Sequence, residues 1–82
     1  MPGDEGVLDQ INRLTERERD LYKRAEADGG LTAEERGEME TLTVDLDRCW
    51  DLLRQRRALR ENGQDPDDAR VRSARTVEGY LS

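Results

Sequence analysis

A helix stop followed within two residues by a helix start is the feature that most constrains the fold of this 82-residue chain. Gly29 and Gly30 end one apolar-periodic stretch, and glycine readily adopts the left-handed conformation that closes a helix C-terminus. Thr32 and Glu35 have the spacing of a capping box, in which each side chain bonds the other residue's backbone N–H. Leu31, directly before the cap, is placed to act as a hydrophobic staple. The sequence therefore predicts two helices joined by a short turn.

The stretches on both sides of this turn repeat apolar residues with the alternating four- and three-residue spacing of an amphipathic helix. The first stripe consists of Val7, Ile11, Leu14, Glu18, Leu21 and Ala25. The second helix is expected from Ala33 to about Asn62, where Asn62-Gly63 is a stop signal. Its stripe consists of Met39, Leu42, Leu46, Cys49 and Leu53, with Thr43, Trp50, Leu52 and Leu59 beside it.

An antiparallel hairpin aligns the two stripes. The expected neighbours are Leu21 with Met39, Leu14 with Leu46, Ile11 with Trp50, and Val7 with Leu53. Trp50 is thus expected in the core, where its truncation is costly, and Cys49 is expected to behave as a small buried hydrophobe. Glu18 interrupts the first stripe, either as an edge residue that reaches water or as a buried polar residue that sets register or oligomeric state.

The predicted fold class is all-α: an antiparallel two-helix hairpin with a short C-terminal helix or turn, dimerising into a four-helix bundle. Residues 1–6 are expected to form a flexible start, residues 7–63 the hairpin and residues 64–82 a C-terminal tail. Asp65 as cap and Pro66 at the first helical position predict a short turn or helix over 66–72. An apolar cluster at the end of the tail is placed to dock on the hairpin: Val77, Tyr80 and Leu81.

Composition excludes several classes of protein. The chain has no histidine and one cysteine, which excludes a histidine-based catalytic or zinc site and a disulfide scaffold. No apolar run approaches the length of a membrane span, and no secretory signal is visible at the start, so a cytoplasmic protein is expected. The small share of large aliphatic residues raises disorder as an alternative, but the strong periodicity of those residues favours folded helices.

The end of the second helix combines tryptophan and leucine with five arginines. Residues predicted to bind a partner are Leu46, Trp50, Leu53, Arg54, Arg57 and Leu59. One interpretation is that the arginine stems cover apolar surface while their heads pair with acids of the first helix, the tail or a second subunit. The alternative is phosphate binding by a basic helix, which the net charge of −6 disfavours.

The same segment, CWDLLRQRRALRENGQDPDDARVR at residues 49–72, resembles the C-terminal half of a family of small actinobacterial proteins known only as a domain of unknown function. The hairpin before it is similar in pattern, and the ends of the chain diverge more. The resemblance implies a compact cytoplasmic helical protein and brings no catalytic residue with it.

These observations predict a non-catalytic helical protein that acts through protein–protein contacts, with no cofactor or metal. A homodimer is expected, because two helices alone leave one side of each apolar stripe in water and a second hairpin covers it. The alternative is a regulatory adaptor that uses the same surface for another cytoplasmic protein, such as a component of the transcription machinery, or for nucleic acid. The abundant carboxylates are expected on solvated helix faces, so an enzyme is the least favoured class.

Overall fold

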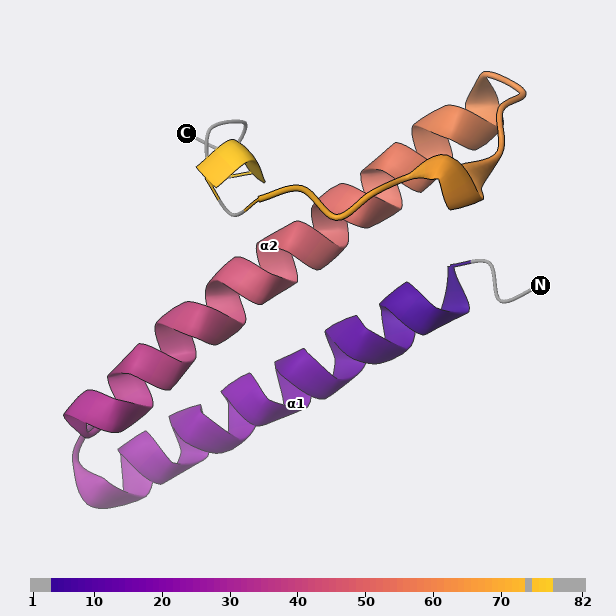
Figure 1. Ribbon diagram of the computed structural model, residues 1–82. Helices are drawn as coiled ribbons and strands as arrows, with labels where there is room; N and C mark the ends of the chain where they lie inside the picture. The colour runs from indigo at the N-terminus through magenta and orange to yellow at the C-terminus, as the bar shows by residue number, and fades with distance from the viewer. Residues whose placement is uncertain (1–3, 74, 78–82) are drawn as a thin grey trace.

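The computed structural model describes residues 4–73 and 75–77, which form an antiparallel helical hairpin with a tail (Figure 1). Helix α1 spans Glu5–Asp28, helix α2 spans Ala33–Glu61, and a short 3₁₀ helix, η1, spans Pro66–Asp68. The described residues contain no β-strand, so the predicted all-α hairpin is confirmed. The molecule measures 50 × 27 × 14 Å, which makes it a plate about one helix thick.

The turn between the helices has the predicted chemistry. Gly29 closes α1 in the left-handed conformation at φ 80°, and the Gly30 N–H donates to the Ala25 carbonyl at 2.8 Å. At the start of α2, the Glu35 N–H donates to Thr32 Oγ1 at 3.1 Å, and the Thr32 N–H donates to Glu35 Oε1 at 3.0 Å. Both halves of the capping box are therefore present.

The outer ends of the helices lie close to their predicted positions. Helix α1 begins at Glu5, two residues earlier than predicted, and α2 ends at Glu61. Gly63 adopts φ 72° just beyond this end, and the Gln64 N–H donates to the Leu59 carbonyl at 2.7 Å. The Asn62-Gly63 pair thus stops α2 within one residue of the predicted position.

The core between the helices is narrow and follows the predicted stripes. Ile11 and Leu21 of α1 are buried, as are Leu42 and Cys49 of α2. Glu18 is only partly exposed. Because each hairpin face is only two helices wide, few side chains are enclosed on all sides.

Trp50 does not belong to this core, so the prediction that it is a core residue is wrong. Its side chain is 47% exposed. The buried residues on the side of α2 that carries its core stripe repeat every seven residues, from Leu42 to Cys49 to Arg56, whereas buried Asp51 belongs to the side that faces the tail. Trp50 comes one residue after Cys49, and one residue turns a side chain by about 100° around a helix. The tryptophan therefore lies on the solvent-facing side of α2.

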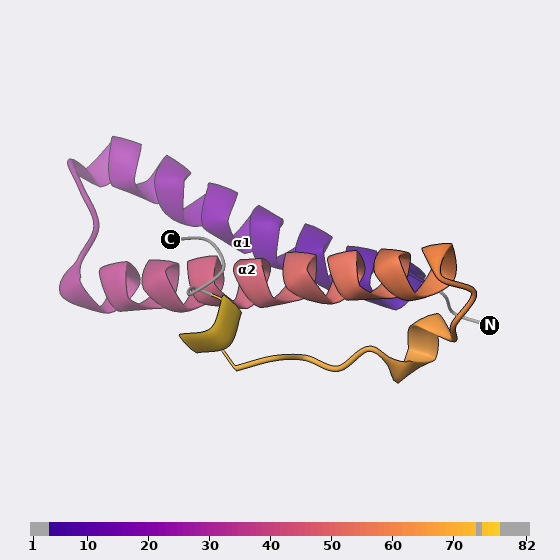
Figure 2. The ribbon, with the colours of Figure 1, turned by 90° about the horizontal axis from the view of Figure 1, so that it is seen from above.

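The tail folds back and runs along α2, on a different side of that helix from most of α1 (Figure 2). Asp65 caps η1 by accepting a hydrogen bond from the Asp67 N–H at 2.9 Å, and Pro66 occupies the first position, as predicted. The helix ends at Asp68 rather than continuing to residue 72, and residues 69–73 are irregular. Val77 is fully buried, as expected for a docked apolar cluster. The other members of that cluster, Tyr80 and Leu81, lie outside the described residues.

Polar side chains of α2 hold the backbone of the tail. Arg48 Nε donates to the Arg72 carbonyl at 2.9 Å, and Gln55 Nε2 donates to the Arg70 carbonyl at 2.7 Å. Between them, Asp51 is 3% exposed, accepts from Gln55 Nε2 at 2.9 Å and pairs with Arg72 at 3.6 Å. Helix α2 thus has a second packing side, which is polar and faces the tail.

The Thr32→Ala variant is expected to lower the free energy of unfolding by about 1 kcal/mol, because the Glu35 N–H loses its acceptor. Thr41→Ala is the matched control, since that hydroxyl donates to the Gly37 carbonyl inside α2 and alanine favours the helix. Urea denaturation of both variants measures the difference. An equal loss in the two would contradict the role of the capping box.

The Cys49 thiol is expected to react slowly with a thiol reagent in the folded chain and rapidly in denaturant. The side chain is buried, and burial raises the pKa of the thiol, so little thiolate is available. Timed labelling with and without urea tests this. Rapid labelling of the folded chain would show that Cys49 is not shielded by α1.

Candidate functional site

The structure brings four of the six residues predicted to bind a partner to one groove: Trp50, Leu53, Arg54 and Arg57. The groove has a volume of about 340 Å³, and its other lining residues are Asp4, Leu8 and Arg60. We call it the Trp50 groove. Leu46 is partly buried outside it, and Leu59 lines a separate hollow against the tail.

Apolar and basic side chains share the Trp50 groove. Leu8 of α1 is 43% exposed and Trp50 of α2 is 47% exposed, so each helix contributes an exposed large apolar side chain, and α2 adds the partly buried Leu53. Arg54 makes one long ion pair, with Asp51 at 3.8 Å. The side chain of Arg57 makes no hydrogen bond or ion pair with any residue that the structure describes. Exposed tryptophan flanked by arginine is typical of the residues that carry binding energy in protein interfaces.

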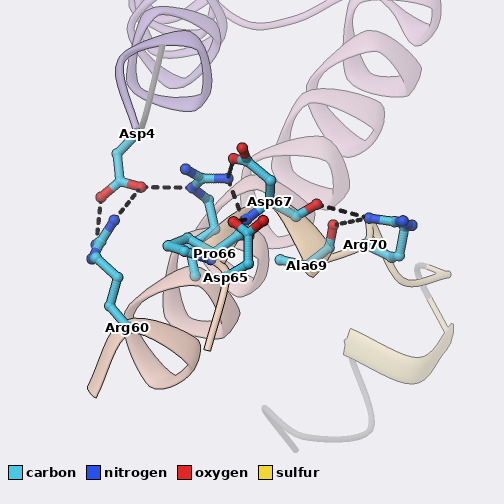
Figure 3. A network of polar contacts seen from close by, with 8 residues as sticks. Asp4, Arg60, Asp65, Pro66, Asp67, Ala69 and Arg70 are labelled. Carbon is cyan, nitrogen blue, oxygen red and sulfur yellow. Dashed lines mark hydrogen bonds and ion pairs between the residues drawn. The ribbon is translucent and has the colours of Figure 1, made fainter. Parts of the chain in front are cut away.

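Four charged side chains form a network at the open end of the hairpin, next to this groove (Figure 3). We call it the Asp4 cluster; it consists of Asp4, Arg56, Arg60 and Asp67. Arg60 donates two hydrogen bonds to the Asp4 carboxylate, from Nη2 at 2.7 Å and from Nη1 at 3.0 Å. Arg56 Nε donates to the same carboxylate at 2.7 Å, and its Nη1 donates to Asp67 Oδ1 at 3.0 Å.

The cluster changes how the arginines of α2 are understood. Arg56 is 8% exposed, and a buried guanidinium requires partners. Asp4, Asp67 and the Pro66 carbonyl supply them. This arrangement matches the interpretation in which arginines pair with acids of the same chain, including the tail.

The cluster also fixes the charges of its members. Hydrogen bonds from Arg60 and then Arg56 hold the pKa of Asp4 well below its usual range. The carboxylates of Asp4 and Asp67 raise the pKa of Arg56. Asp4 and Arg56 therefore stay charged near neutral pH, which suits a structural link and not proton transfer.

A signal for the cluster exists in the sequence. Asp4 lies three residues before Val7, and Arg56 lies three residues after Leu53, so both continue the stripes in their own spacing. The predicted register, with Val7 opposite Leu53, also places Asp4 opposite Arg56 one turn further on. Apolar spacing alone ends the stripes at Val7 and Leu53, so it does not indicate their charged continuation.

Other chemistry is sparse in the described part of the chain. A second hollow of about 260 Å³ borders Cys49, with Arg48 and Asp45 among its lining residues. Within residues 4–73 and 75–77, no three Asp, Glu, Cys or His side chains converge in a way that could hold a metal ion. In the same residues, neither helix offers an apolar stretch long enough to cross a membrane.

The Asp4→Asn variant is expected to lose about 1–2 kcal/mol of folding free energy at pH 7, since the bonds to two guanidinium groups lose their charge. Because the pKa of Asp4 is lowered in the folded chain, its carboxylate is protonated at a higher pH in the unfolded chain than in the folded chain. The contribution of Asp4 is therefore complete above the ordinary aspartate pKa of about 3.9 and is lost as the pH falls below it.

Urea denaturation of the wild type and Asp4→Asn at pH 7 and pH 3 tests this, with Asp9→Asn as a control on the exposed side of α1. The gap between wild type and Asp4→Asn should narrow at pH 3. A gap of the same size at both pH values would show that the carboxylate charge contributes nothing.

Comparison of the sequence with known proteins assigns the chain to a family. The family model described as "Protein of unknown function (DUF2630)" matches residues 3–82. The uncharacterized proteins Mb0922c of Mycobacterium bovis and Rv0898c of Mycobacterium tuberculosis are each 44% identical to the chain over 79 residues. The aligned region covers 96% of this chain and 91% of each relative. No solved structure matches the chain. The chain therefore belongs to the DUF2630 family of small proteins with mycobacterial members, in agreement with the resemblance in its Arg-rich segment.

Proposed function

We propose that this chain is a non-catalytic helical protein that acts through protein–protein contacts as a homodimer, with the Trp50 groove as the contact surface. The observation that carries the proposal is the exposure of Trp50 beside Leu8, in a groove formed by both helices. A folded chain gains little from a tryptophan half in water, whereas an interface gains much from covering it.

The shape of the molecule supports a second copy as the occupant. At 14 Å the hairpin is one helix thick, so its open face has no second layer. Two hairpins packed face to face form a four-helix bundle, which is the usual way for short helical chains to enlarge their core. Such packing covers Trp50, Leu8 and Leu53 together.

The Asp4 cluster weakens the alternative of nucleic-acid binding through the Arg-rich end of α2. Asp4 and Asp67 already engage Arg56 and Arg60, which reduces the number of arginines available to phosphate. The remaining groove arginines, Arg54 and Arg57, flank Trp50 and suit a protein surface that carries acids. A regulatory adaptor that binds a transcription component through the same groove is the second candidate.

The proposal includes no enzymatic step. The one thiol, Cys49, is buried and has a raised pKa, and Asp4 is bound to guanidinium groups. In this proposal the protein works in the cytoplasm, where a single unpaired cysteine stays reduced.

Sedimentation equilibrium over a wide concentration range tests the homodimer. The wild type is expected to show twice its chain mass of 9.5 kDa. Trp50→Ala should raise the dimer dissociation constant by about thirtyfold or more, because each dimer loses two aromatic contacts. Tyr22→Ala is the matched control, because this aromatic side chain is 56% exposed on α1 and lies roughly four helical turns from Leu8.

A mass of 9.5 kDa at every concentration would refute the homodimer. Binding to duplex DNA or structured RNA that falls steeply with salt would favour the nucleic-acid alternative. That binding should then disappear in Arg54→Glu/Arg57→Glu. These two positions are suitable because neither belongs to the Asp4 cluster, so the fold is expected to survive.

A further inference from the structure

We propose that the second copy lies antiparallel on α2, with the twofold axis beside Trp50, so that Asp47 of each copy contacts Arg54 of the other. This inference rests on the homodimer proposed above and adds its orientation and register. It follows from the one side of α2 that neither α1 nor the tail covers.

That open side of α2 has a regular composition. Its residues follow the same alternating three- and four-residue spacing as the core stripe, so they share one face of the helix. In order they are Glu40, Thr43, Asp47, Trp50, Arg54 and Arg57. All are exposed except Asp47, which is partly exposed. The face is therefore acidic before Trp50 and basic after it.

These charges are largely unused within the chain. The side chains of Glu40, Asp47 and Arg57 make no hydrogen bond or ion pair with the described residues, and among those residues the side chain of Arg54 has only its 3.8 Å pair with Asp51. They are thus available to a second copy.

Only one orientation makes the face complementary to itself. In an antiparallel pair centred on Trp50, Asp47 meets Arg54 of the other copy, and Thr43 meets Arg57. In a parallel pair Asp47 meets Asp47 and Arg54 meets Arg54, and such like-charge contacts oppose association. The twofold axis repeats each favourable contact, which is the property of an isologous interface.

The antiparallel arrangement also suits the rest of the fold. The tail runs along α2 (Figure 2) and is bound by Arg48, Asp51 and Gln55, none of which belongs to the open face. Near the axis, Trp50 of each copy lies against Trp50 of the other copy and enters the groove between Leu8 and Leu53 of that copy.

A charge exchange between two variants tests the register. Asp47→Arg and Arg54→Asp are each expected to raise the dimer dissociation constant by about tenfold, since each turns two attractive contacts into repulsive ones. When the two variants are mixed, one copy brings two arginines and the other two aspartates to the contact. The mixture is therefore expected to form a heterodimer at least as tight as the wild type.

Glu26→Arg serves as the control, because it makes the same change of charge at an exposed position of α1 near the turn. It should leave the dissociation constant within about twofold of the wild type. Circular dichroism melting of each variant verifies that the helices are intact.

Cross-linking gives an independent readout of orientation in a Cys49→Ser background. Thr43→Cys and Arg57→Cys single variants should form a disulfide with each other on mild oxidation, and each alone should cross-link slowly. Rapid cross-linking of each variant with itself, or no rescue in the charge exchange, would overturn the antiparallel register while the homodimer stands. A wild type that sediments as a monomer would instead remove the homodimer itself.

Discussion

Asp4 binds Arg56 and Arg60 at the open end of the hairpin, where no loop joins the two helices. A single carboxylate accepts three hydrogen bonds there, and Arg56 extends the link to Asp67 of η1. The start of α1, the end of α2 and the tail thus meet at one point (Figure 3). With so narrow an apolar core, the alignment of the helices depends strongly on this contact and on the Gly29–Thr32 turn at the other end.

Local signals made the turn and the helix ends predictable. Gly29, Thr32, Glu35 and Gly63 act through their own backbone geometry and through neighbours within five residues, so the sequence alone contains the needed information. The face of each helix that packs inward also followed from apolar periodicity. The environment of Trp50 did not, because periodicity assigns a side to each residue but does not say how far burial extends around the helix.

The charged parts of the structure were harder to predict. Arg56 occupies a core position of its stripe, yet a guanidinium is ordinarily assigned to the surface unless its partner is known. That partner, Asp4, is distant in sequence, and its relevance emerges only when both stripes are continued through charged residues. Apolar periodicity also predicts only one packing side for helix α2. In the structure Arg48, Asp51 and Gln55 form a second, polar side, which hydrophobicity could not indicate.

The way in which α2 holds the tail has a consequence for how this family can diverge. Arg48 and Gln55 bind carbonyl groups of residues 70 and 72, and every residue type provides a carbonyl. The contact therefore specifies the path of the tail without specifying most of its side chains. Except at Arg72, whose side chain pairs with buried Asp51, substitutions along residues 69–73 can accumulate with little effect on docking, provided that the backbone keeps its course. A change at Gln55, by contrast, removes contacts that no tail mutation can replace. The side chains that determine the path of the tail thus belong mainly to helix α2 and not to the tail itself.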